Sequence, residues 1–264
     1  MRKSEGRTVK SVETACEILR QLRQHNGHTV SGLAAELDLS PGSVHTQLTT
    51  LKQFGYVVKD DGQYTLGPEF LPMGEYVRNN SLLYNAVKGQ IDDLVEKTGE
   101  AAHLIIEHHG RLYSLYERFG WNAVGVRYHR RKRQNAIRHL HCTAAGKAIL
   151  ANVSEERFVS IINENGLPQM TDNTITKIDE LVDELEEIRE RGIAFADEEQ
   201  IEGLRAVGAP VHDPDGDVLG AVALSGPVSR LQDERFRQTF PDMVRDAAQV
   251  GELTMQTEDI GGNL

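Results

Sequence analysis

One stretch of this chain carries a nearly complete set of signals for a single helix. It reads SPGSVHTQLTTLKQFG over residues 40–55. Ser40 is a favoured N-cap, Pro41 fits the first helical position, and Gly55 suits the stop. Apolar residues repeat at helical spacing, at Val44, Leu48 and Leu51. The pattern predicts a helix with one side in a core and an opposite side that is small, polar and uncharged.

The segments around this helix predict its setting. Two helices are expected before it, one from Ser11 and a shorter one over residues 31–37, and a hairpin is expected after it, with its turn at Asp61-Gly62. This order is that of a winged helix-turn-helix, whose third helix enters the DNA major groove. A three-helix bundle with a solvated face is the alternative. The first helix has its apolar stripe at Val12, Ala15, Ile18, Leu19 and Leu22, beside Cys16, which is expected to be a buried thiol.

Charge is unevenly distributed along the chain. Residues 1–74 hold eight Lys and Arg against eight Asp and Glu, whereas residues 75–264 hold 21 against 32, so the net charge of -11 belongs to the second part. The first part therefore permits an anionic partner, and double-stranded DNA is the expected one. The residues predicted to contact it are Ser40, Gly42, Ser43, His45, Thr46, Gln47 and Thr49 on the third helix and Arg2, Lys3, Arg7 and Lys10 in the N-terminal arm.

The rest of the chain predicts a second domain of α+β class. A segment with apolar residues at helical spacing ends at Gly99 and is expected to be a linker helix. Strands, then helices, then strands and a last helix follow, which favours one antiparallel sheet covered by helices. The expected divisions are residues 8–69 for the winged helix-turn-helix, 70–98 for the linker helix, 99–254 for the second domain and 255–264 for a disordered tail.

The segment LHCTAAGKAIL, residues 140–150, suggests chemistry at first sight. A phosphate-binding loop is excluded because His141 and Ala148 stand where that motif needs Gly and Ser or Thr. Adjacent Cys142 and His141 would point to opposite faces of a strand, which disfavours a catalytic dyad, although a Cys-dependent enzyme remains an alternative function. Lys147 is expected at the surface or in packing, with no chemical role.

Histidines and basic residues in the second domain raise two further alternatives. No spacing typical of metal ligands occurs, so no metal and no cofactor is expected, although His139 and His141 would share a face of an extended segment. The run RYHRRKRQNAIRH, residues 127–139, lacks the aromatic residues of a nucleic-acid patch, which favours a solvated loop or a contact between subunits.

Targeting signals are not expected in this chain. No stretch approaches the roughly 20 apolar residues of a membrane span, and the basic, polar start MRKSEGRTVK does not predict a signal peptide. The two cysteines, at positions 16 and 142, do not suggest a disulfide framework. A cytoplasmic protein without membrane association is therefore expected.

The chain resembles a known family in two places. Residues 9–68, with LAAELDLSPGSVH, LKQFGYV and YTLGP, are similar to the DNA-binding domain of the IclR family of transcriptional regulators. LHCTAAGKAILA and GIAFADEEQIEGLRAVGAPVHDPDGDVLGAVALSGPVSR are similar to signature segments of its effector-binding domain. The resemblance implies a non-enzymatic regulator with a GAF-like α/β effector-binding domain, a small-molecule effector, and a homodimer that can pair into a tetramer. A regulator that binds DNA without an effector is the alternative.

The resemblance also implies which residues bind an effector, and it shows where this sequence differs from other family members. In family members Arg often stands at Thr46 and a basic residue in the wing, which here reads DDGQ. Asp often stands at Ala196, and Ser or Cys at Ala206 and Ala223, so a larger and more apolar effector, or none, is expected here. The effector-binding residues implied are Cys142, Thr143, Ala144, Ala145, Gly146, Ala196, Leu204, Ala206, Ala223 and Ser225.

Overall fold

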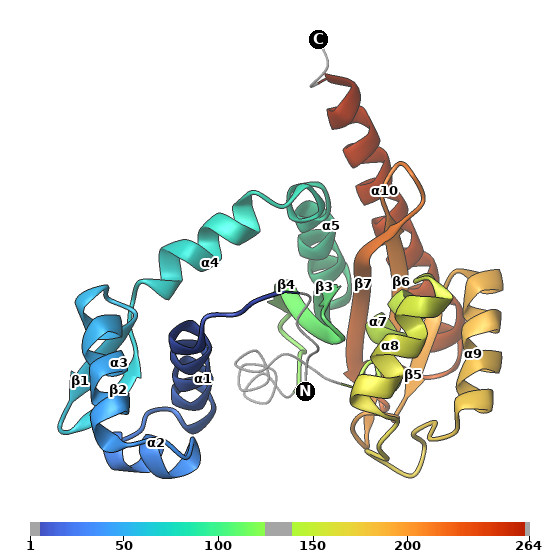
Figure 1. The fold of residues 1–264 in the computed structure, drawn as a ribbon. Helices are drawn as coiled ribbons and strands as arrows, with labels where there is room; N and C mark the ends of the chain where they lie inside the picture. The colour runs from blue at the N-terminus through green and yellow to red at the C-terminus, as the bar shows by residue number, and fades with distance from the viewer. Residues whose placement is uncertain (1–5, 125–138, 262–264) are drawn as a thin grey trace. The chain divides into compact units, whose positions relative to one another are not determined.

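The computed structural model describes residues 6–124 and 139–261, with side chains as far as Thr257. The chain divides into two compact units, Met1–Arg78 and Asn79–Leu264. Figure 1 shows helices with a small two-stranded hairpin in the first unit and a larger sheet with helices in the second. Among the described residues, no helix is long and apolar enough to cross a membrane.

The first unit has the order of elements that the sequence predicts. Thr29 caps α2 by accepting a hydrogen bond from the Gly32 N–H, and Ser40 caps α3 in the same way from Ser43. Strands β1 and β2 pair antiparallel around the Asp61-Gly62 turn. The winged helix-turn-helix arrangement is therefore confirmed. Its elements are α1 (Lys10–His25), α2 (Val30–Glu36), α3 (Pro41–Gln53), β1 (Val57–Asp60) and β2 (Gln63–Leu66).

A single apolar cluster holds this unit together. It is made by Ile18, Leu22, Leu33, Ala34, Val44, Leu48, Val57 and Tyr64. The expected inward stripe of α1 is wrong at its first turn, because Val12 is 57% exposed, and the expected burial of Cys16 is also wrong, since that residue is exposed.

The linker is two helices, not the single helix expected over residues 70–98. Helix α4 (Phe70–Asn79) ends before Ser81, which caps α5 (Leu82–Thr98) by accepting a hydrogen bond from the Tyr84 N–H. A cap of this kind starts a new helix because its own backbone is extended. Helix α5 ends at Gly99, whose φ of 72° is readily adopted by glycine. The boundary between the two units lies at the junction of α4 and α5.

The second unit is built on one five-stranded antiparallel sheet, as the sequence predicts. The strand order is β4-β3-β7-β6-β5, which places β5 at one edge. Strands β3 and β7, far apart in sequence, are paired neighbours in its centre. The strands are β3 (Ala101–His108), β4 (Arg111–Phe119), β5 (Ala194–Asp197), β6 (Leu204–His212) and β7 (Val218–Pro227).

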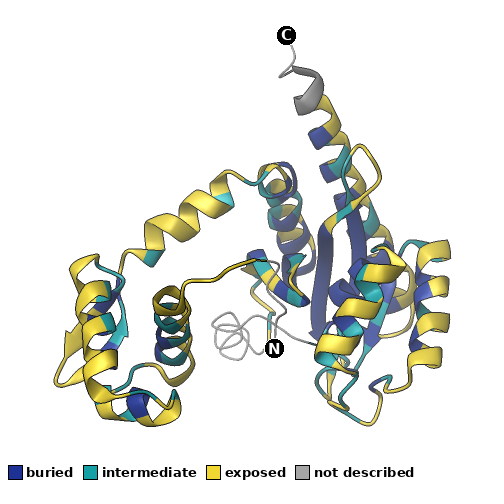
Figure 2. Cartoon of the chain, in the orientation of Figure 1, coloured by how far each residue is buried: buried dark blue, intermediate teal, exposed yellow. Residues whose placement is uncertain are grey.

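Helices cover both faces of this sheet, so its three inner strands, β3, β7 and β6, are buried along most of their length (Figure 2). Val222 and Leu224 face the apolar cluster formed with helices α5 and α10. Ala221 and Ala223 face the apolar cluster formed with helices α7, α8 and α9. This alternation follows from the two-residue period of a strand. The remaining helices are α7 (Ala144–Leu150), α8 (Glu155–Asn165), α9 (Ile178–Arg191), the π-helix η1 (Arg235–Thr239) and α10 (Phe240–Gly261).

The end of the chain differs from the expectation. The sequence predicts a disordered tail from residue 255, but α10 continues to Gly261 and Met255 is only 5% exposed, within the core on the α10 face. The last helix therefore continues into the segment that is expected to be disordered. The stretch AVGVRY, residues 123–128, is also typical of a strand in the sequence, but residues 123 and 124 form none, and the rest of it lies outside the described residues.

Candidate DNA-binding face and effector site

The outer face of α3 presents the residues that the sequence predicts for DNA contact. Ser40, Gly42, Ser43, His45, Thr46 and Thr49 are exposed, and Gln47 is half-buried beside the core. Val44 and Leu48 are fully buried on the opposite side, so packing fixes which face is outward. The helix therefore offers a polar surface without bulky side chains, which suits close approach to base edges.

The threonines of this face have their hydroxyl hydrogens committed to the helix backbone. Thr46 Oγ1 donates to the Gly42 carbonyl at 3.0 Å, and Thr49 Oγ1 donates to the His45 carbonyl at 2.8 Å. In this arrangement each hydroxyl presents only its acceptor lone pairs and each side chain also presents a methyl group. Acceptors and methyls are complementary to the amino groups and the thymine methyl of the major groove.

The exposed lysine and arginine residues of α3 and the wing, within the described residues, are Lys52 and Lys59. Arg7 and Lys10 are exposed at the start of α1, and Lys10 lies 3.5 Å from the Glu13 carboxylate. The arm residues Arg2 and Lys3 lie outside the described residues. In the hairpin, Asp61 and Gly62 have φ angles of 43° and 79°, so both turn residues are in the left-handed region that a tight two-residue turn requires. Acidic residues thus occupy the tip of the wing.

The residues expected to bind an effector lie on one face of the sheet and on α7. Ala196 pairs with Ala206, Ala206 pairs with Ser225, and Ala223 pairs with Gly208. Residues paired directly across strands share a face, so these alanines and Ser225 face the same side as Ala221 in the α7 cluster. Leu204 lies two residues before Ala206 on β6, so its side chain is on the same face of the sheet. Ala196, Ala223 and Ser225 are buried, whereas Leu204 and Ala206 are half-buried.

Small residues allow α7 to lie against the strands. A Cβ atom at Gly208 would be 2.8 Å from the Ala144 carbonyl carbon and 2.9 Å from the Ala145 nitrogen. A Cβ atom at Gly146 would be 2.2 Å from the Leu140 carbonyl oxygen. The Thr143 hydroxyl caps this short helix by accepting a hydrogen bond of 3.0 Å from the Gly146 N–H. The glycines and alanines of the motif therefore serve close packing of backbone on backbone.

Two polar residues of this face were not predicted from the sequence. His103 Nε2 lies 3.0 Å from Ser225 Oγ, and His103 Nδ1 lies 3.3 Å from Glu117 Oε2. His103 and Glu117 are cross-strand partners on β3 and β4, and both side chains are at least nine-tenths buried. Ser225 is 122 positions away from His103, so only the strand register brings the three together. The arrangement provides a buried hydrogen-bonding centre beside the alanines.

Cys142, His141 and the preceding His139, at the start of the LHCTAAGKAIL segment, make separate contacts. Cys142 is fully buried, and its Sγ lies 3.4 Å from the His139 carbonyl oxygen. His141 Nε2 lies 3.1 Å from the Pro168 carbonyl oxygen, and burial lowers the pKa of His141 from its ordinary 6.5. Within residues 6–124 and 139–257, no three His, Cys, Asp or Glu side chains form a group suited to a metal ion. The basic run of residues 127–139 lies outside the described residues, apart from its last position.

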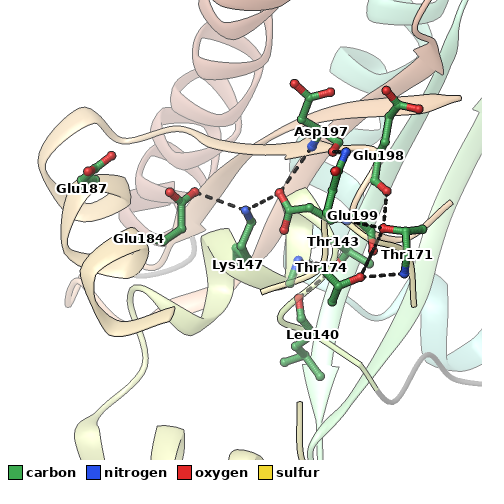
Figure 3. A network of polar contacts seen from close by, with 12 residues as sticks. Leu140, Thr143, Lys147, Thr171, Thr174, Glu184, Glu187, Asp197, Glu198 and Glu199 are labelled. Atoms are coloured by element: carbon green, nitrogen blue, oxygen red, sulfur yellow. Dashed lines mark hydrogen bonds and ion pairs between the residues drawn. The ribbon is translucent and has the colours of Figure 1, made fainter. Parts of the chain in front are cut away.

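Lys147 is buried, so of the two positions expected for it, at the surface or in packing, the structure shows packing. Only 1% of it is exposed. Its Nζ lies 2.7 Å from Glu199 Oε1 and 3.2 Å from Glu184 Oε1, as Figure 3 shows. The ammonium group of Lys147 thus joins α7 to α9 and to the loop after β5. Partners 37 and 52 positions away in the sequence could not be inferred from the motif itself.

Both units match known families. A model of the bacterial transcriptional regulator IclR C-terminal domain matches residues 75–250, and a model of bacterial regulatory proteins of the arsR family matches residues 13–59. The chain belongs to the IclR family of transcriptional regulators. This confirms the resemblance inferred from the sequence. As an IclR-family protein with a helix-turn-helix domain, the chain is a DNA-binding transcriptional regulator.

Individual IclR-family relatives match along nearly the whole chain. The probable HTH-type transcriptional regulator ArcR of Halobacterium salinarum is 39% identical over 96% of each chain. The crystal structure of the Thermotoga maritima IclR is 26% identical, with a TM-score of 0.71 over 93% of this chain and 98% of that one. An IclR homologue from Microbacterium hydrocarbonoxydans, solved in complex with 4-hydroxybenzoate, is 18% identical, with a TM-score of 0.74 over 91% and 99%. This last likeness concerns the fold.

Proposed function

We propose that this IclR-family regulator binds a pseudo-palindromic operator as a homodimer, with α3 of each subunit in the major groove. The observation that carries the proposal is the outer face of α3, where Ser43, His45, Thr46 and Thr49 are exposed opposite the buried Val44 and Leu48. Direct readout needs side chains that reach base edges while the other face of the helix stays in its core.

Exposed apolar side chains in the first unit support the homodimer. Val9 and Val12, at the start of α1, are 60% and 57% exposed, and Leu71, Tyr76 and Val77 on α4 are each about 70% exposed. Apolar side chains gathered on a monomer surface are typical of a contact between proteins. A second copy of this chain is the partner that a two-fold symmetric operator calls for, since the symmetry of the dimer then matches that of the DNA. Pairing of such dimers into a tetramer is compatible with this arrangement.

Phosphate contacts play a small part in the proposed complex. The face of α3 is uncharged, the wing ends in Asp60 and Asp61, and the second unit is acidic. Each phosphate that a protein neutralises adds to the salt dependence of binding. We therefore expect the basic arm before α1, including Arg7 and Lys10, to supply most of the electrostatic attraction.

We further propose that the α7 face of the second unit binds an effector that is larger and more apolar than a keto acid. Ala196, Ala206 and Ala223 offer no polar atoms, and a small anion there would lose its water without side-chain hydrogen bonds in return. Ser225, held by His103, offers one polar point for a carboxylate or carbonyl group. The complex of the Microbacterium hydrocarbonoxydans homologue with 4-hydroxybenzoate supports an aromatic acid as a candidate. A regulator without an effector is the second candidate.

Regulation is favoured over a Cys142-dependent enzyme. Cys142 is fully buried, and the neighbouring His141 has its Nε2 against the Pro168 carbonyl oxygen. A nucleophile needs a base within hydrogen-bond reach and access to a substrate. The named relatives are regulators. Since a regulator works where chromosomal DNA is found, the cytoplasm is its proposed location.

Footprinting on the DNA upstream of the protein's own gene tests the proposal. The expected result is protection of two half-sites about one helical turn, or a multiple of it, apart. Sedimentation of Leu71→Glu is the companion measurement, and the variant should be monomeric and should lose the footprint. Protection of a single half-site by a monomeric wild type would contradict the dimer.

A further inference from the structure

A polar cleft of about 470 Å³ opens at the β5 edge of the sheet. Its walls come from α7, α9, β5, the loop that follows β5, and η1. None of the ten residues expected to bind the effector lines it. The cleft is therefore separate from the alanine-lined face described above, although both involve α7.

Lys147 and Glu199 form the most buried part of this cleft (Figure 3). The Lys147 ammonium is held between Glu199 and Glu184, at 2.7 and 3.2 Å. Burial of a lysine is tolerated when carboxylates compensate its charge. The backbone of Glu199 is fixed in turn, because its carbonyl oxygen accepts a hydrogen bond of 2.6 Å from the Thr174 hydroxyl.

Glu199 retains an unsatisfied acceptor. Its Oε1 atom accepts a hydrogen bond from the Lys147 ammonium group and another, of 3.3 Å, from the Asp197 N–H. Its Oε2 atom is buried and has no hydrogen-bond partner in the part of the chain that the structure describes. The residue is 7% exposed, and burial raises the pKa of its carboxyl group against the opposing effect of Lys147. A buried acceptor without a donor destabilises the protein, so a bound N–H group would be stabilising here.

Arg237 contributes a complementary charge to the lining of the cleft. Its side chain is 57% exposed, and its contact with Asp197 is long, at 3.9 Å. Asp197 is already bound by Arg205 through hydrogen bonds of 2.6 and 3.1 Å. The Arg237 guanidinium lies 4.9 Å from the ring centroids of both Phe195 and Phe236, which holds it in place by cation–π contact. A guanidinium held in this way is suited to a carboxylate.

We propose that this cleft binds a small zwitterion of the α-amino acid class, with the ammonium group on Glu199 and the carboxylate on Arg237. The charges around the cleft favour a ligand with no net charge. The basic side chains and the carboxylates there are equal in number when Arg205, the partner of Asp197, is included. They are Lys147, Arg191, Arg205 and Arg237 against Glu184, Glu187, Asp197 and Glu199. Since Lys147 belongs to α7, the zwitterion acts on the same helix that borders the effector face.

Thermal unfolding of the full chain with each proteinogenic amino acid, at about 10 mM, tests this proposal. At least one of them should raise the melting temperature, and isothermal titration should then give its Kd. Propionate and propylamine, which carry only one of the two charges, should have no effect at the same concentration. Absence of any shift with all the amino acids, or an equal shift with propionate alone, would overturn the assignment.

Three variants locate the binding. Arg237→Gln and Glu199→Gln should each raise the Kd of the amino acid about tenfold or more, because each removes a charge-assisted hydrogen bond. Arg235→Gln is the matched control on the same π-helix, since Arg235 does not line the cleft, and it should leave the Kd unchanged. If loss of the Lys147 partner prevents Glu199→Gln from folding, Arg237→Gln decides alone. An unchanged Kd in Arg237→Gln would refute the site.

Discussion

Gly208 of β6 lies directly against Ala144 of α7, so closely that a Cβ atom at Gly208 would stand 2.8 Å from the Ala144 carbonyl carbon. Nothing flexible separates the two elements, because the three nearest contacts are all with backbone atoms of Ala144 and Ala145. This contact sets the distance between α7 and the sheet and therefore the depth of the face on which the effector is proposed to bind.

Gly208→Ala should lower the free energy of unfolding by about 1–3 kcal/mol, because the added methyl group forces α7 away from the strand. Urea denaturation measures the change. Gly89→Ala is the control, since nothing lies within 4 Å of a Cβ atom there. Replacing that helical glycine should be stabilising by up to about 1 kcal/mol. Equal effects in the two variants would show that α7 yields to the extra atom.

Ser43→Ala and His45→Ala should weaken operator binding by about 1–3 kcal/mol each, because each removes a polar group from the exposed face of α3. Neither side chain packs in the core, so the melting temperature should not change. Electrophoretic mobility shifts on the footprinted site provide the measurement. Arg20→Ala, exposed on α1, should bind as the wild type does. If both variants retained full affinity, α3 would not be the reading helix.

The salt dependence of operator binding should be shallow, with a slope of log Kd against log salt of about three to five, since each neutralised phosphate contributes about 0.9. Deletion of residues 1–7 should flatten the slope further. Thr46→Arg should make the slope steeper, because it adds one cation per subunit to the face of α3 that contacts DNA. Fluorescence anisotropy over a salt series measures all three. A steep slope that survives the deletion would contradict the proposed role of the arm.

Aromatic or medium-chain acids should raise the melting temperature, whereas pyruvate and glyoxylate should not. Ala223→Asp should then weaken the bound acid, because a buried carboxylate beside its apolar part lacks a partner. Ala223→Ser is the conservative control if the charged variant folds poorly, because it adds one hydroxyl at a residue that is only 4% exposed. Stabilisation by the small keto acids alone, or unchanged affinity in Ala223→Asp, would place the effector elsewhere.

His141 should make the protein less stable in mild acid. Burial lowers its pKa in the folded state, so the unfolded chain binds a proton more readily, and stability falls as the pH drops below the ordinary value of 6.5. His141→Asn should lose less stability than the wild type between pH 7 and about 5.5. The other nine histidines are present in both proteins, so the difference between the two curves isolates His141. Parallel curves would contradict its burial as a neutral ring.

Local pattern was sufficient to predict most of the fold. The caps and apolar spacing of α3 and the Asp61-Gly62 turn are signals within a few residues of the structure they specify. The break between α4 and α5 was not foreseen, because apolar spacing continues on both sides and only the cap at Ser81 marks it. The end of α10 was misjudged because the burial of Met255 depends on the rest of the core.

In the candidate sites, too, features set by local sequence were predicted and features set by long-range contacts were not. The outer face of α3 follows from helical periodicity, so its exposed residues were identified correctly, while their contacts with DNA remain a prediction. His103 and Glu117 were missed, because their proximity to Ser225 depends on strand register across β4, β3 and β7. The ion pairs of Lys147 were not predicted, because its partners lie on α9 and after β5.

The tight fit of α7 on the sheet also limits how the specificity of this regulator can evolve. Where backbone meets backbone, as at Gly208 and Gly146, mutations that add volume carry a stability cost before they reach any ligand. Exchanges of nearly equal size, such as Ala to Ser or Cys, change polarity at little steric cost. New effector preferences are therefore most accessible through single small polar substitutions, and a duplicated copy of the gene would diverge in ligand before it diverged in architecture.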